Sequence, residues 1–415
     1  MPNYIALAVP FFLALIGLEV WAAKRQRRSL YRFNDAVIDL STGISQQVSL
    51  IFFKAALLAA YALVYRYRPI ELPPGSVLTW VLAIVLIDLS YYWWHRLSHQ
   101  VNFLWAAHVV HHSSEEYNLA VALRQGVLTP LTILPFHLPL ALLGIPPLVF
   151  LAVDSFNTLY QFWIHTQLVD KLGSFEKWIN TPASHRVHHA INPRYLDKNF
   201  GGTFIVWDRL FGTYEPETEQ PVYGIVKALR SFDPLVAQFH YWPDLWARAG
   251  STRAWADKLR VFLKGPDWTP PGMKPFAPPS EVRPETFVKY DPLVPVSLAR
   301  YLFVQLSLVI IGATALMFYE TALPLAQLAV GAAFVFSSLI AWGAFFEHRP
   351  WALRFELLRL LALAAAAFAW VWVSPRMLPI AGGTLLFVGL MVIWLLRDRR
   401  SLGSPAPSQL GAIKG

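Results

Sequence analysis

Residues 77–112 read VLTWVLAIVLIDLSYYWWHRLSHQVNFLWAAHVVHH and combine a long apolar run with five histidines. Its first half, 77–94, is apolar apart from one aspartate and approaches the roughly 20 residues that a membrane helix needs. Two histidine groups follow, His95-Arg-Leu-Ser-His99 and His108-Val-Val-His111-His112. The stretch therefore predicts a membrane helix that ends at a cluster of imidazoles.

Two further histidine groups follow later in the chain. His165 ends another apolar stretch, and His185-Arg-Val-His188-His189 lies in a polar segment. Spacings of three and four residues place side chains on one face of a helix. All four groups fall at or beyond the inner ends of apolar helices, or in the polar segment on that side. We therefore expect the imidazoles to converge on one metal site at the membrane surface.

Imidazole is a ligand for Fe, Zn, Cu and Ni. Nine nitrogens exceed the coordination of one ion and suit two ions that keep open positions for water or O₂. The predicted ligands are His95, His99, His108, His111, His112, His165, His185, His188 and His189.

The composition agrees with a membrane protein. Of the 415 residues, 55% are hydrophobic and 15% are charged, against about 25% charged in an average soluble chain. The chain has no cysteine, which excludes disulfides, thiolate zinc sites and iron–sulfur clusters. The formal charge of +9 is attributed to Lys and Arg at membrane ends, and no nucleic-acid partner is expected.

We expect an all-α, polytopic helical membrane protein of about nine membrane helices, with a cytoplasmic cap that carries part of the dinuclear metal site. The helices at 119–164 meet at the turn Gly144-Ile145-Pro146-Pro147 and need not cross the bilayer fully. The polar segment 166–295 ends in a proline-rich stretch from 265. The expected spans are 4–23, 43–65, 77–94, two helices in 119–164, 298–319, 323–346, 353–373 and 377–396.

The expected domains follow from these spans. Residues 1–42 form an N-terminal helix and basic loop, 43–297 the histidine-rich oxygenase domain, 298–397 a four-helix membrane region and 398–415 a tail. With the polar segment 166–295 left out, twelve Lys and Arg are counted at the inner ends and three at the outer ends if the N-terminus is outside. The positive-inside rule therefore predicts an outside N-terminus, an inside C-terminus and a cytoplasmic histidine site, in a bacterial inner membrane or the ER.

Polar residues near the histidines are candidates for orienting the metal-bound rings, since ligating imidazoles usually donate their second nitrogen to a carboxylate or carbonyl. These candidates are Asp88, Asp154, Asn157, Gln161, Glu115 and Glu116. For Asp88 and Asp154 a hydrogen bond between helices is the alternative. Arg124 and Arg186 are candidate contacts for lipid phosphate or an electron donor, with an interfacial charge as the alternative.

These motifs resemble the fatty acid hydroxylase/sterol desaturase superfamily of integral-membrane di-iron oxygenases. The similarity covers about residues 30–220 and most closely follows the alkylglycerol monooxygenases. The stretches that carry it are His108–Leu119, Leu123-Arg-Gln, Tyr160–Thr166, Asn180–His189, Asp197–Thr203 and Trp207–Thr213.

The resemblance implies two Fe ions, a membrane lipid substrate, O₂ and a separate electron donor. Tetrahydrobiopterin is the reductant in the resembling family, and zinc is able to replace iron. The implied reaction is hydroxylation of a lipid C–H bond, next to the ether oxygen if the substrate is a glyceryl ether. Hydroxylation or desaturation of sterol, fatty acyl or sphingoid lipids is the alternative. A histidine-rich metal transporter is the alternative of another class.

Overall fold

The computed structural model describes residues 4–276, 280–373, 376 and 378–402, and within them the fold is all-helical, as expected. Two isolated β-bridges, Ile179 with Phe204 and Ala190 with Tyr223, are the extended pairings seen in these residues. The described chain forms two compact units, residues 1–230 with 237–289 and residues 231–236 with 290–415. The expected boundaries at 42, 297 and 397 remain predictions. Residues 403–415 of the expected tail lie outside the described residues.

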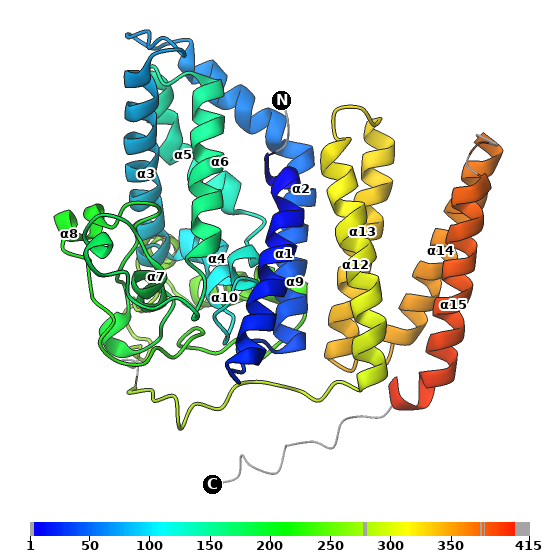
Figure 1. Cartoon of the computed structure of the whole chain (residues 1–415). Helices are drawn as coiled ribbons and strands as arrows, with labels where there is room; N and C mark the ends of the chain where they lie inside the picture. Colours follow the sequence, from blue (N-terminus) through cyan, green and yellow to red (C-terminus); the bar gives the residue numbers. More distant parts are fainter. Residues whose placement is uncertain (1–3, 277–279, 374–375, 377, 403–415) are drawn as a thin grey trace. The chain divides into compact units, whose positions relative to one another are not determined.

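The first unit contains eleven α-helices and three short 3₁₀ helices in its described residues, counting α9, which crosses the boundary (Figure 1). They are α1 (Tyr4–Arg25), α2 (Phe33–Tyr65), α3 (Val77–Gln100), α4 (Asn102–His112), η1 (Val121–Leu123), α5 (Thr129–Leu142), α6 (Pro147–Trp163), η2 (Gly173–Lys177), α7 (Pro182–His188), η3 (Pro193–Tyr195), α8 (Val206–Phe211), α9 (Pro234–Phe239), α10 (Tyr241–Ser251) and α11 (Trp255–Leu263).

Helix α2 begins ten residues before the expected span at 43. Its first turns carry Asp35 and Asp39, which lie before the expected span, and Gln46 follows near the start of that span. The structure buries these side chains against protein instead of lipid. Helix α2 therefore begins with a polar part that is covered by protein, here called the base of α2, and continues as an apolar membrane segment.

Helices α5 and α6 meet at the expected turn. The turn needs glycine, because Gly144 has φ +88° and a Cβ there would lie 2.4 Å from the carbonyl oxygen of Ile70. Helix α5 has 14 residues and α6 has 17, so both are shorter than the roughly 20 residues of a full span.

Six helices in the described residues are long and apolar enough to cross a membrane. They are α1, α2, α3, α12, α13 and the part of α15 up to Asp398. The chain is thus a multi-pass integral membrane protein, whereas the expected count of nine spans and the cytoplasmic placement of the cap remain predictions.

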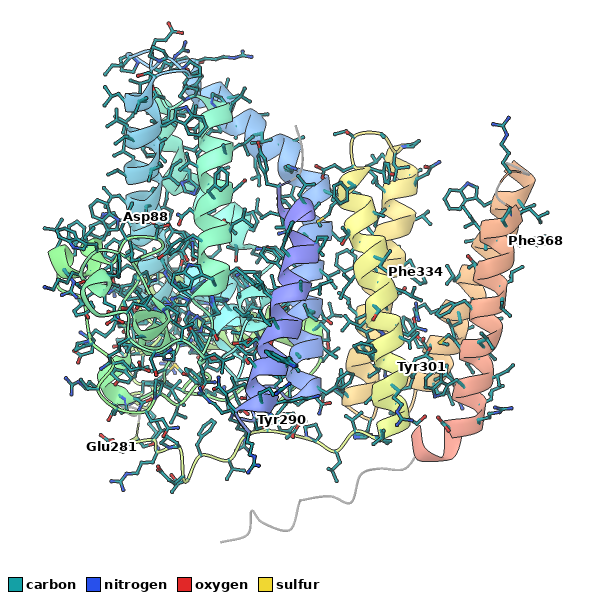
Figure 2. The ribbon with its side chains drawn as sticks, in the orientation of Figure 1. Asp88, Glu281, Tyr290, Tyr301, Phe334 and Phe368 are labelled. Atoms are coloured by element: carbon teal, nitrogen blue, oxygen red, sulfur yellow. The ribbon has the colours of Figure 1, made fainter. Side chains whose placement is uncertain are left out.

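The second unit contains four long helices, α12 (Val296–Phe318), α13 (Leu325–Phe346), α14 (Ala352–Val373) and α15 (Leu378–Leu402). Its interior holds a buried ion pair between Arg359 and Glu356, with nitrogen–oxygen distances of 2.6 and 2.7 Å. Tyr301, labelled in Figure 2, donates to the same carboxylate. Arg359 also donates to Ser338 and Gln305. Three helices are joined by these bonds.

Close packing of α2 against η1 supports the segment that follows the second histidine group. The Cα of Gly43 faces the backbone of Leu123, and a Cβ at this position would lie 2.2 Å from the Leu123 carbonyl oxygen. The Leu123 oxygen belongs to the backbone and not to a flexible side chain, so a Cβ at position 43 would force the backbone to shift. Gly17 in α1 is different, since nothing lies within 4 Å of a Cβ built there.

We expect Gly43→Ala to lower the free energy of unfolding of the first unit by about 1–3 kcal/mol, the usual cost of overpacking. Gly17→Ala is the matched control and should be neutral or slightly stabilising, because alanine favours the helix more than glycine. Thermal unfolding of both variants in the same detergent measures the difference. Equal melting temperatures would contradict the packing described here.

Candidate metal centre

Nine histidines gather at one end of the upright helices of the first unit, where Figure 1 shows α4 and α7 close to the lower end of α3. They arrive on α3, on α4, just after α6, and on α7. The structure separates them into two groups. One holds His95, His99, His108, His112 and His188, and the other holds His111, His165, His185 and His189. In each group, one ligand atom per residue lies within 4.8 Å of the others.

The two histidine groups are in direct contact. The rings of His112 and His189, one from each group, stack with centroids 4.4 Å apart. The rings of His188 and His189 meet edge-on at 5.3 Å. Eight of the nine residues are buried, and His99 is partly exposed. The expected convergence of four separate sequence groups is therefore what the structure shows.

Backbone carbonyls orient two rings of the first group. Nδ1 of His95 lies 2.8 Å from the carbonyl oxygen of Phe200, and Nδ1 of His188 lies 2.9 Å from that of Lys198. Lys198 and Phe200 belong to one short segment in which Asp197 and Asn199 have positive φ. A carbonyl only accepts, so Nδ1 carries the proton in both rings. The Nε2 atoms of both rings have no hydrogen-bond partner in the described structure and present free lone pairs.

The second group follows the same rule. Nδ1 of His111 donates to the carbonyl of Arg124 at 2.9 Å, and Nδ1 of His165 donates to that of Gln161 at 2.7 Å. The two Nε2 atoms then carry lone pairs, yet they lie only 3.3 Å apart. Two acceptors cannot hydrogen-bond to each other. Two nitrogens bound to one metal at about 2.1 Å and at right angles lie about 3.0 Å apart, so this spacing fits a shared cation.

Burial keeps the rings in the neutral form that binds metal. It lowers the pKa of His111 to about 4 and that of His188 to about 3. It also lowers the pKa of His112, His185 and His189 well below the usual value. A protonated imidazole cannot coordinate a cation, so neutral rings at pH 7 favour binding. The donor set is therefore compatible with two imidazole-rich metal sites.

Asp88 does not contact an imidazole, which corrects its expected role. Its carboxylate accepts hydrogen bonds from the backbone N–H groups of residues 203 and 204 at 2.7 and 3.1 Å, and from the Trp207 indole at 2.8 Å. Figure 2 shows Asp88 on α3 beside these loops. A loop from much later in the chain occupies the carboxylate, and the loop in turn carries the carbonyl that holds His95.

Asp208 is a second anchor of this loop, and the sequence reasoning missed it. Its two carboxylate oxygens accept from the backbone N–H groups of Phe200 at 2.7 Å and Gly201 at 2.8 Å. The Thr213 hydroxyl donates to it as well. Asp208 thus fixes the residue whose carbonyl orients His95.

The other expected orienting residues act elsewhere or through the backbone. Gln161 holds His165 with its carbonyl rather than its side chain, and Asn157 accepts from the hydroxyl of Thr203 at 2.9 Å. Asp154 lies 3.6 Å from Nε2 of His137, which is outside the cluster.

The paired glutamates form ion pairs with basic residues. Glu116 contacts Arg32 at 2.6 Å and Lys289 at 2.5 Å, and Glu115 lies 3.6 Å from Arg32. These contacts connect the segment after the second histidine group to the base of α2. Glu116 therefore holds the surrounding chain, whereas the expected role of either glutamate in orienting an imidazole remains a prediction.

Arg124 and Arg186 are internal ties, which corrects their expected role as lipid or donor contacts. Arg124 is buried, pairs with Asp39 at 3.0 Å, and donates to the Val110 carbonyl at 2.9 Å. Arg186 makes two bonds of 2.7 Å to the Glu217 carboxylate. A guanidinium matched in this way to a carboxylate has its donors occupied, so neither side chain is free to receive a phosphate.

Glu19, on α1, is a further site residue that the sequence reasoning missed. It is buried, accepts from the Leu119 backbone N–H at 2.8 Å, and is bonded by the hydroxyls of Tyr31 and Thr166. Thr166 directly follows His165. A carboxylate within a membrane helix marks a functional or structural site by default, and that signal was present in the apolar sequence 4–23.

The comparisons with known proteins agree with this geometry. The family described as Fatty acid hydroxylase matches residues 80–213, which contain all nine clustered histidines. The chain is 39% identical to the alkylglycerol monooxygenase of Homo sapiens over 371 residues, covering 87% of this chain and 82% of that protein.

Two further relatives extend this comparison. The chain is 38% identical to the alkylglycerol monooxygenase of Danio rerio, over 86% of this chain and 81% of that protein. It is 28% identical to the ornithine lipid hydroxylase OlsE of Rhizobium tropici, over 51% of this chain and 67% of that protein. No solved structure matches the chain. The histidine-rich centre and these similarities together establish that the chain is a membrane oxidoreductase of the alkylglycerol monooxygenase family, with a fatty acid hydroxylase domain.

Proposed function

We propose that the nine histidines hold two iron ions and that the protein uses O₂ to hydroxylate a glyceryl ether lipid at the carbon next to the ether oxygen. The observation that carries the proposal is the division of the rings into groups of five and four, with unpaired nitrogens facing one another. Iron, when bound, would supply O₂ activation and C–H oxidation. Zinc binds the same donors and would occupy the sites without redox activity.

The reaction balances with an external reductant. O₂, two electrons and two protons convert the ether carbon to a hemiacetal and release one water. The hemiacetal breaks its C–O bond to give a fatty aldehyde and a free glycerol hydroxyl. We propose tetrahydrobiopterin or another separate donor as the electron source, because the implied chemistry needs electrons that no described residue supplies.

The protein's own residues orient and enclose the reacting site. Carbonyls of residues 124, 161, 198 and 200 fix the tautomers of four imidazoles. Asp88 and Asp208 hold the loop that carries the Phe200 carbonyl. Burial of the rings limits the water that would compete with substrate. These residues act as positioning residues.

We also propose that the site lies on the cytoplasmic side, with the N-terminus outside and the C-terminus inside. With the polar segment 166–295 left out, the excess of twelve basic residues over three at the two sets of helix ends supports this orientation.

A second candidate is hydroxylation or desaturation of another lipid at the same centre. The similarity to a relative named ornithine lipid hydroxylase supports a wider choice of lipid in proteins with related sequences. Metal transport is less well supported. A transport path needs polar ligands distributed through the membrane, whereas these imidazoles form one cluster at helix ends.

We expect His111→Ala and His188→Ala each to lower the iron content of anaerobically purified protein, because each removes one imidazole nitrogen from its group of four or five. Activity should fall by more than about 100-fold, beyond the loss typical of residues that only support a ligand. Metal analysis and O₂ uptake measure the two effects.

The control for these variants is His348→Asn, in the second unit. His348 has a positive φ that asparagine tolerates, so this variant should keep its metal. Full iron content in either cluster variant, with a normal elution profile, would remove the proposed ligand role.

We expect protein reconstituted with iron and tetrahydrobiopterin to release labelled fatty aldehyde from a labelled alkylglycerol. Sterols and free fatty acids should give no comparable O₂ uptake, because they lack the ether carbon. Mass spectrometry of the products and an oxygen electrode provide the measurements. Turnover of another lipid but not the ether by iron-loaded protein would select the second candidate.

A further inference from the structure

Helices α10 and α11 form a pair that packs on α4, the helix of the second histidine group. The core of this contact is Ala106 of α4 with Leu245, Ala249 and Val261. The inner faces of α10 and α11 are therefore covered by protein. Their outer faces have to be explained separately.

Hydrogen bonds to a single residue fix the pair at the end of α3. Asn102 lies two residues after α3 ends at Gln100. Its side chain donates to the Val261 carbonyl at 2.8 Å and accepts from the Tyr241 hydroxyl at 2.6 Å, and its backbone N–H donates to the Lys264 carbonyl at 2.9 Å. Helix α3 is long and apolar enough to span the membrane. The pair therefore lies at the depth where α3 leaves the bilayer.

The outer face of α11 is an exposed apolar stripe. Trp255, Leu259 and Leu263 follow one another at intervals of four residues, and their exposed fractions are 79%, 63% and 64%. Trp246 of α10 is 64% exposed and contacts Phe262 of α11 with ring centroids 4.9 Å apart. Exposed apolar stripes of this kind mark an interaction site.

The stripe is accompanied by positive charge. Residues 241–264 contain five basic and two acidic side chains. The basic residues are Arg248, Arg253, Lys258, Arg260 and Lys264. The Lys258 ammonium lies 5.0 Å from the Trp255 ring centroid. Basic residues beside a Trp and Leu face are typical of a helix that lies in the plane of a membrane interface.

We propose that α11, supported by α10, binds the membrane surface, with Trp255, Leu259 and Leu263 entering the headgroup–acyl boundary and Arg253 and Lys258 binding anionic phospholipid headgroups. The excess of basic residues in 241–264 favours anionic lipid. The hydrogen bonds of Asn102 hold α10 and α11 at the end of α3, which is the depth of the headgroups. The proposal depends on insertion of α3 but not on the proposed reaction. Because α11 and α4 share a core, the membrane surface would also brace the helix that carries His108, His111 and His112.

The absence of cysteine from the sequence allows a direct test on the full chain. Leu259→Cys and Leu263→Cys are labelled with a nitroxide, and the protein is reconstituted in nanodiscs of mixed zwitterionic and anionic phospholipid. Accessibility to O₂ against a water-soluble nickel chelate reports depth. We expect both labels to lie about 5–10 Å below the headgroup boundary.

Arg260→Cys is the control on the same helix and should report a shallower position, because its side chain points about 100° away from Leu259. Arg194→Cys, on an exposed side chain of the first unit, gives the value for water. A label at 259 as accessible to nickel as the label at 194 would overturn the proposal. So would protection that requires an added protein partner instead of lipid.

The charge component has its own test. In the Leu259→Cys background, Arg253→Gln with Lys258→Gln should shift the equilibrium from membrane-bound to water-exposed label by about fivefold per removed charge. The shift should be absent in purely zwitterionic nanodiscs. An unchanged depth in both lipid mixtures would overturn the role of anionic headgroups. The depth measurement needs no turnover, so its result is independent of whether the protein catalyses the proposed reaction.

Discussion

Buried imidazole nitrogens face one another in the first unit, and their lone pairs repel. Backbone carbonyls fix the Nδ1 protons of His111 and His165, which turns both Nε2 lone pairs toward each other at 3.3 Å. Neutral rings in this arrangement gain nothing from one another. A bound cation would convert the repulsion into coordination and would thereby link metal binding to folding of the cluster.

The structure uses backbone rather than side-chain acceptors to hold these rings, which gives the carboxylates a more distant role. Asp208 and Asp88 bind the backbone of residues 200–204, and that backbone binds His95. A change at either aspartate would therefore reach the metal through a shift of the loop. A backbone carbonyl cannot change its charge, so the group that accepts the Nδ1 proton of His95 does not itself titrate.

The spacing of the histidines was enough to predict the cluster, because a helix turns residues at intervals of three and four to one side. Partners contributed by distant loops could not be predicted in this way. Asp88 shares a helix face with His95, but the loop at 203–207 takes its carboxylate. Arg124 follows the second histidine group, and its charge is neutralised by Asp39. Asp39 lies in the first part of α2, which the hydropathy pattern did not assign to a helix. Glu19 was predictable in principle, since it stands alone among apolar residues.

The depth of the cluster gives a physical reason for the proposed substrate. Helix α3 has 24 residues and is therefore about 36 Å long, whereas the hydrocarbon core is about 30 Å thick. His95 and His99 lie in its last two turns, so they reach the boundary between acyl chains and headgroups when the first residues of α3 lie at the opposite boundary. The ether carbon of a glyceryl lipid lies at this boundary when the lipid rests in the bilayer. Oxidation there requires little movement of the headgroup, while a mid-chain carbon would have to rise out of the membrane core to reach the same rings.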